Sequence, residues 1–105
     1  MTVTRTLPAR RVEDRPVTTV SPDPVYLAAV LGPRLARLLT TPDQQAVAAR
    51  IIRQIADREC PGVARAWMTG MNPHLGDEAP LLAIVDGLAS DVEAAARAYL
   101  DGVWT

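Results

Sequence analysis

The chain lacks phenylalanine and lysine, and its 105 residues include only two Trp and two Tyr. With so few aromatic rings, a core has to be built mainly from Leu, Ile, Val and Ala side chains, and hydrophobic residues of all kinds make up 49% of the sequence. A chain of this length predicts one small domain. Because a short chain buries a limited area, contacts with a partner or a second copy would add to its stability.

Cysteine and histidine are also scarce, with one residue each, Cys60 and His74. A lone cysteine forms no disulfide within the chain, and one His with one Cys lacks the paired spacing of a metal site. We interpret Cys60, which precedes Pro61 at an expected helix end, as a small buried hydrophobic residue. The sequence predicts a protein that binds no metal ion and no cofactor.

Long hydrophobic runs are missing too. No apolar run approaches the ~20 residues that cross a bilayer. The start of the chain contains arginines but lacks the apolar segment of a signal peptide. We therefore expect a cytoplasmic protein that does not enter the membrane.

The arrangements that support catalysis are not found either. His74 lies between Pro73 and Leu75, with no Ser or Cys beside it, whereas covalent catalysis needs a nucleophile next to a base. Asp77 and Glu78 are adjacent, and we interpret them as charges at a helix end rather than as an acid/base pair. No glycine-rich phosphate loop follows a predicted strand. The sequence predicts a protein that is not an enzyme.

Strict alternation of apolar and polar residues, typical of strands, is absent after the first 20 residues, and helical signals take its place. The clearest helix starts at Thr41, a good N-cap, and Pro42, and carries an apolar stripe along one face. Ser90 is expected to cap the last helix. Together the caps, prolines and glycines predict helices over residues 24–31, 33–40, 42–58, 62–69, 80–86 and 91–101. The expected fold class is all-α, a small single domain of five or six short helices.

Composition and charge divide the chain into three parts. Residues 1–20 combine Thr, Pro and Arg without a helical period, which predicts a flexible or extended arm. Residues 21–61 are expected to form a helical region for oligomerisation, with the rhythm of a degenerate helix-turn-helix, and residues 62–105 a second set of helices. Residues 1–65 hold ten Arg and six acidic residues, whereas residues 66–105 hold one Arg and six acidic residues. The basic half suits a nucleic-acid backbone and the acidic half a basic protein surface, with ordinary solvated faces as the alternative.

A possible DNA-reading surface lies on the longest expected helix. Arg50, Arg53 and Gln54 are side chains of the base-reading type and are grouped there. A helix-turn-helix protein reads DNA when its second helix presents such side chains to base edges. These three residues are the candidate DNA-binding residues, and a solvated arginine face is the commoner meaning of such a group.

The stretch WMTGMNPHLGDEAPLLAIVDG, residues 67–87, contains an Asn-Pro turn and a Pro-started apolar helix that ends at a glycine. It resembles the C-terminal signature of the toxin-binding domain of Xre/MbcA/ParS-like antitoxins, which belong to bacterial type II toxin–antitoxin systems. The matching positions are Trp67, Asn72, Pro73, Leu75, Gly76, Pro80, Leu81 and Gly87, followed by the segment from Val92 to Val103. The resemblance covers about residues 62–105, which it implies are a toxin-binding domain. The chain departs from the family at Ala79, where a hydroxyl residue is usual, and at Asp77, which replaces a second glycine.

The resemblance implies a partner and a way of blocking it. Family members neutralise RES-domain toxins, which consume NAD or transfer ADP-ribose, and the antitoxin would block the NAD pocket with its C-terminal segment. In this sequence the segment is Asp101, Gly102, Val103, Trp104 and Thr105, with Trp104 or the terminal carboxylate inserted into the pocket. Trp67, Asn72 and His74 complete the expected toxin-binding residues.

Three functions remain open at this point. The first is an antitoxin that binds a RES-like toxin and forms a homo-oligomer or a hetero-oligomer with it. The second is a DNA-binding transcriptional regulator, which could also control the operon that encodes it. The third is a helical scaffold without either activity.

Overall fold

A computed structural model of the chain describes residues 23–102, in which all regular secondary structure is helical. The helices are α1 (Asp23–Leu31), α2 (Pro33–Ala36), α3 (Pro42–Arg58), α4 (Pro61–Thr69), the 3-10 helix η1 (Pro73–Leu75), α5 (Pro80–Val85) and α6 (Ala89–Leu100). The predicted all-α class is therefore confirmed. The arm expected over residues 1–20 lies outside the described residues, as do the tail positions Val103, Trp104 and Thr105.

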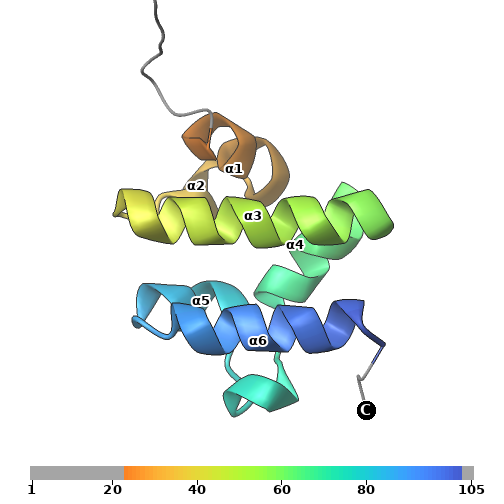
Figure 1. Ribbon diagram of the computed structural model, residues 1–105. Helices are drawn as coiled ribbons and strands as arrows, with labels where there is room; N and C mark the ends of the chain where they lie inside the picture. Colours follow the sequence, from red (N-terminus) through yellow and green to blue (C-terminus); the bar gives the residue numbers. More distant parts are fainter. Residues whose placement is uncertain (1–22, 103–105) are drawn as a thin grey trace, which may run out of the picture.

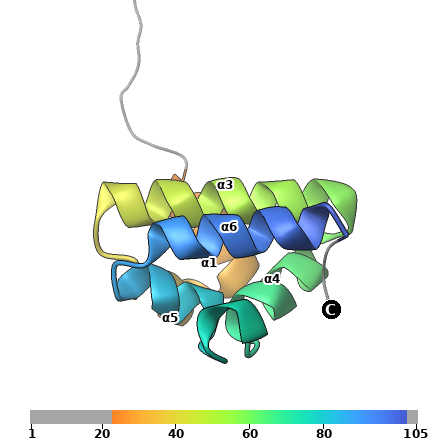
Figure 2. The ribbon, with the colours of Figure 1, turned by 60° about the horizontal axis from the view of Figure 1, so that its bottom comes forward.

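Helix α3 is the centre of the fold (Figures 1 and 2). In Figure 1, α1 and α2 lie on one side of α3, and α5 and α6 lie on the other. Helix α4 follows α3 directly and packs against α3, α5 and α1. Both views show α3 and α6 side by side and running in the same direction.

The start of α3 is fixed by the predicted cap. The Gln44 amide N–H donates to the Thr41 hydroxyl at 3.1 Å, and the Gln44 side-chain oxygen accepts from the Thr41 amide at 3.4 Å. This reciprocal capping box satisfies two amides that a helix start otherwise leaves without partners. Pro42 occupies the first helical position, where its missing N–H costs nothing.

One hydrophobic core joins the N-terminal and C-terminal helices. It contains Ile51, Ile52 and Ile55 of α3, together with buried side chains from α1, α4, α5 and α6. The residues expected as a separate C-terminal part therefore share their core with the residues before them. The face formed by α5 and α6 is supported from beneath by α3.

Helix α2 ends four residues earlier than the sequence predicts, at Ala36 instead of residue 40. The reason is the cap of the next helix, because the Thr40 amide donates to the Gln44 side-chain oxygen at 2.9 Å. Leu39 is buried in the intervening turn. The Thr40 amide is thus bonded at the start of α3 and is not available to extend α2.

Two local predictions near other helix ends are wrong. Ser90 does not cap α6, because the helix begins at Ala89 with Leu88 at the N-cap position. The Leu88 amide donates to the Ala83 carbonyl at 2.9 Å, which places the start of α6 directly beside α5. Cys60 is exposed instead of buried, because it stands in extended conformation at the N-cap of α4, outside the packed face of either helix.

Candidate partner-binding surface

The turn between α4 and α5 is organised around the buried side chain of Asn72. Only 2% of Asn72 is exposed. Its side-chain oxygen accepts from the His74 amide at 2.9 Å, and its carbonyl oxygen accepts from the amides of Leu75 and Asp77, both at 2.9 Å. Three amides of the following loop thus bond to one residue, which fixes the loop conformation.

The loop then reverses through two left-handed residues. Gly76 has a φ of 64° and Asp77 a φ of 69°. No atom lies within 4 Å of the position that a Cβ on Gly76 would take, so glycine is needed there for backbone conformation and not for space. Asp77 stands where the antitoxin family has a second glycine, and aspartate is among the few other residues that adopt this conformation readily.

Proline and glycine set the limits of α5. Pro80 occupies its first position and is buried, while Ala79 at the N-cap supplies no side-chain cap. The helix ends at Val85, and Gly87, with a φ of 89°, turns the chain toward α6. The short loop and the short helix are therefore held in one arrangement relative to the core.

Trp67 and Asn72, two of the expected toxin-binding residues, lie beneath the surface. Trp67 is 9% exposed, and its ring centroid is 6.1 Å from that of Tyr99 on α6. Its indole N–H is buried and has no acceptor among residues 23–102. In the free chain both residues shape the surface from below and do not offer a contact to a partner.

The exposed positions of the expected site lie on η1 and at the end of α6. His74 is exposed on η1, and Asp101 and Gly102 are exposed directly after α6. Helix α6 packs against η1. Met71, which no sequence pattern identified as a site residue, is 82% exposed beside the Asn72 turn. Its position before Asn-Pro was the only available signal.

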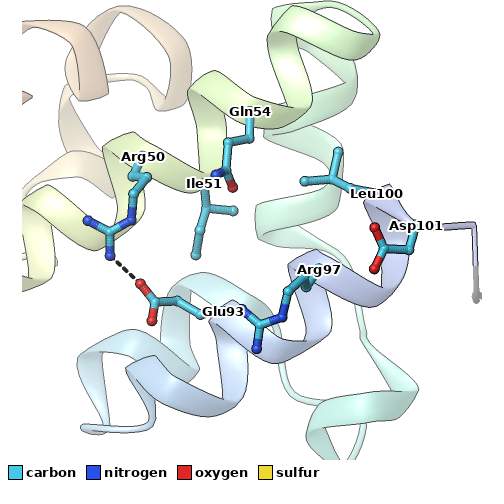
Figure 3. Close-up of a pocket in the computed structure, with 7 residues that line it drawn as sticks. All are labelled: Arg50, Ile51, Gln54, Glu93, Arg97, Leu100 and Asp101. Carbon is cyan, nitrogen blue, oxygen red and sulfur yellow. Dashed lines mark hydrogen bonds and ion pairs between the residues drawn. The ribbon is translucent and has the colours of Figure 1, made fainter.

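The three candidate DNA-binding residues do not form one group, because Arg50 and Arg53 bond to different helices. Arg50 donates to the carboxylate of Glu93 on α6, whereas Arg53 donates to Asp23 of α1 at 3.2 Å and stacks over the Tyr26 ring at 4.5 Å. Gln54 is exposed. Figure 3 shows Arg50 and Gln54 on one wall of a groove of about 250 Å³ between α3 and α6. The arginines connect α3 to its neighbours on two sides and do not form one common face.

The surface near α5 is acidic. Residues 66–96 contain five Asp or Glu and no Lys or Arg. A hydrogen bond with the Asp86 carboxyl raises the pKa of Glu78, and partial desolvation and the Asp86 charge raise that pKa further. Two carboxyl groups are thus held together by the loop and the end of α5 with repulsion between them at neutral pH.

Comparisons of the chain with protein-family models, with curated proteins and with solved structures find no match. Within residues 23–102, no three His, Cys, Asp or Glu side chains gather as a possible metal site. No helix of that range is long and apolar enough to cross a membrane. The function of the surface therefore has to be argued from its own shape and charge.

The backbone role of Gly76 predicts opposite effects for two alanine substitutions. Gly76→Ala should lower the free energy of unfolding by about 1 kcal/mol, because an L-residue is strained in the left-handed region. Gly62→Ala, the matched control inside α4, should raise it by roughly 0.5 kcal/mol, because alanine favours helix. Urea denaturation monitored by circular dichroism measures both. A destabilisation of equal size in the two variants would contradict the assignment.

The Glu78–Asp86 pair predicts a pH-dependent stability change for Glu78→Gln. A carboxyl whose pKa is raised on folding stabilises the fold below its unfolded pKa, and this stabilisation disappears as the pH rises through the folded pKa. Glu78→Gln removes the repulsion, so its melting temperature should exceed that of the parent chain at pH 7. The difference should vanish on acidification below the unfolded pKa. Asp57→Asn, which removes an exposed carboxylate from α3, is the control and should not reproduce this pattern.

Proposed function

We propose that this protein is an antitoxin that binds and inhibits a RES-domain toxin, which consumes NAD or transfers ADP-ribose. The docking surface is the Asn72 turn together with the end of α6. The chain acts by occupying the partner, and it carries out no reaction itself.

The observation that carries this proposal is the coincidence of the motif with the turn geometry. Four motif positions set the loop conformation and the two ends of α5: Asn72, Gly76, Pro80 and Gly87. Their shared role is to hold a defined shape at the surface, with His74 and Met71 exposed on it. Methionine suits such a contact because its flexible thioether adapts to a partner.

Charge supports a partner of this kind. A pocket that binds the negatively charged phosphates of NAD is expected to be basic, and the acidic half of this chain complements it. Asp101 and Gly102 are exposed at the end of α6, so a partner can reach the point from which residues 103–105 continue. Trp104 is the proposed group that enters the NAD pocket.

The alternative, a DNA-binding regulator, has less support from the geometry. Arg50 and Arg53 are paired with carboxylates of other helices. At the start of α3, the Gln45 side-chain amide donates to the Leu39 carbonyl at 3.0 Å. Side chains that already serve the fold must break these contacts before they can read bases, which weakens binding.

Coexpression with a RES-domain protein encoded beside this chain tests the proposal. We expect the two proteins to purify as a complex in which NAD consumption is inhibited. Removal of Val103, Trp104 and Thr105 should restore NAD consumption, because the inserted group is lost. His74→Ala should weaken the complex by roughly tenfold, the usual order for an interface contact worth more than 1 kcal/mol.

Arg58→Ala, an exposed change at the far end of α3, is the matched control and should leave both affinity and inhibition unchanged. Full inhibition by the truncated chain would rule out the inserted tail. Failure of every neighbouring RES-domain protein to bind the full chain would rule out the function itself. A gel shift on the promoter of the same operon at low salt, lost in Arg50→Ala, would favour the regulator instead.

A further inference from the structure

The helices α1 and α2 form a surface that is both apolar and basic, here called the basic face. Residues 24–42 contain Arg34 and Arg37 and no Asp or Glu, and Asp23 at the start of α1 is paired with Arg53 of α3. Val25 is 73% exposed, and Leu38 is exposed as well. A hydrophobic side chain in water is unfavourable, so this face gains stability when something covers it.

The basic face contains a cavity that fits an aliphatic side chain. Its volume is about 270 Å³, and it lies between α1, α2 and the start of α3. Most of its lining is apolar, with Leu27, Ala28, Pro33 and Leu39, and Arg37 is its one charged lining residue. The Gln45 side-chain amide donates one hydrogen bond to the Leu39 carbonyl at 3.0 Å. The cavity suits an apolar group that has a carboxylate next to it.

A second surface of the same chain offers this chemistry and is here called the acidic face. Leu82 is 45% exposed on α5, and Leu88 is 43% exposed between α5 and α6. Asp86 lies one helical turn after Leu82, since its amide donates to the Leu82 carbonyl at 2.9 Å. The proximity of Asp86 raises the pKa of the Glu78 carboxyl group, so the two acidic side chains lie near each other. Exposed leucines therefore stand beside two carboxyl groups that repel each other.

The two faces cannot meet within one molecule. Figure 1 shows α3 between them, with α1 and α2 on one side and α5 and α6 on the other. Contact between the faces requires a second copy of the chain.

We propose that copies of this protein associate head to tail, with the acidic face of one copy on the basic face of the next. Leu82 or Leu88 enters the cavity, and Arg34 and Arg37 meet the Glu78–Asp86 pair. This contact relieves the repulsion between the two carboxylates and covers exposed apolar side chains on both copies. A symmetric contact of two basic faces would place Arg34 and Arg37 of both copies together, and like charges at an interface are unfavourable.

A head-to-tail contact has a consequence that a symmetric dimer lacks. Each copy keeps one unused face, so association continues into chains or closes into a ring. Damage to either face should stop growth, and two copies damaged on different faces should still form one intact contact with each other. This gives a test that uses the purified chain alone and does not depend on the proposed toxin.

The experiment compares three forms by analytical ultracentrifugation over a range of concentrations. The basic-face variant carries Arg34→Glu and Arg37→Glu, and the acidic-face variant carries Leu82→Ser and Leu88→Ser, so the two damaged faces do not attract each other in a mixture. We expect the parent chain to exceed dimer mass as its concentration rises, less so in high salt. Each variant alone should associate roughly tenfold more weakly or not at all, because the basic-face variant sets like charges against each other and the acidic-face variant lacks both leucines that could enter the cavity. Their equimolar mixture should form a 1:1 dimer and grow no further.

Arg58→Glu with Arg65→Glu makes the same charge change on exposed positions elsewhere and should associate like the parent chain. Circular dichroism melting of every variant verifies that the fold is intact. A parent chain that stays monomeric at all concentrations would overturn the proposal. So would a closed dimer that only the basic-face variant disrupts, or a mixture in which the two variants do not bind each other.

Discussion

The hydrogen bonds of Asn72 are the constraint on which the C-terminal surface depends. A buried amide is unfavourable unless its polar atoms have partners, and here the side-chain oxygen and the carbonyl of Asn72 accept from His74, Leu75 and Asp77. If the loop changed its conformation, a buried oxygen of Asn72 would lose its hydrogen-bond donor. The turn therefore keeps one shape, and the exposed side chains on it are held in place for a partner.

The central helix links this surface to the rest of the chain. Ile51, Ile52 and Ile55 belong to the core that α3 shares with α1, α4, α5 and α6, while Arg50 and Arg53 reach outward to Glu93 of α6 and Asp23 of α1. These arginines are partly exposed, and exposed ion pairs contribute little free energy, on the order of 0–1 kcal/mol. Their role is to orient the neighbouring helices on α3, for which the hydrophobic core supplies most of the stability.

Local signals in the sequence predicted helix ends well where a cap residue, a proline or a glycine sets the end by itself. Thr41 with Pro42 marked the start of α3, and Pro80 with Gly87 marked the limits of α5. Predictions failed where a residue between two helices bonds to the neighbouring helix and so shifts a helix end. Leu88, and not Ser90, lies at the start of α6, where its amide bonds to the Ala83 carbonyl of α5. The Thr40 amide bonds to Gln44 at the cap of α3 and does not extend α2. For the site, the turn residues could be predicted, whereas the burial of Trp67, the exposure of Met71 and the partners of Arg50 and Arg53 follow from packing between distant segments.

Amide hydrogen exchange in the Asn72→Ala variant tests the central claim most directly. Without the side-chain acceptor, exchange at His74 should accelerate the most, followed by Leu75 and Asp77, whose bonds depend on the same loop conformation. Amides in the middle of α3 should keep the protection that they have in the parent chain. Unchanged exchange at all three loop amides would contradict the account, because the turn would then keep its shape without Asn72.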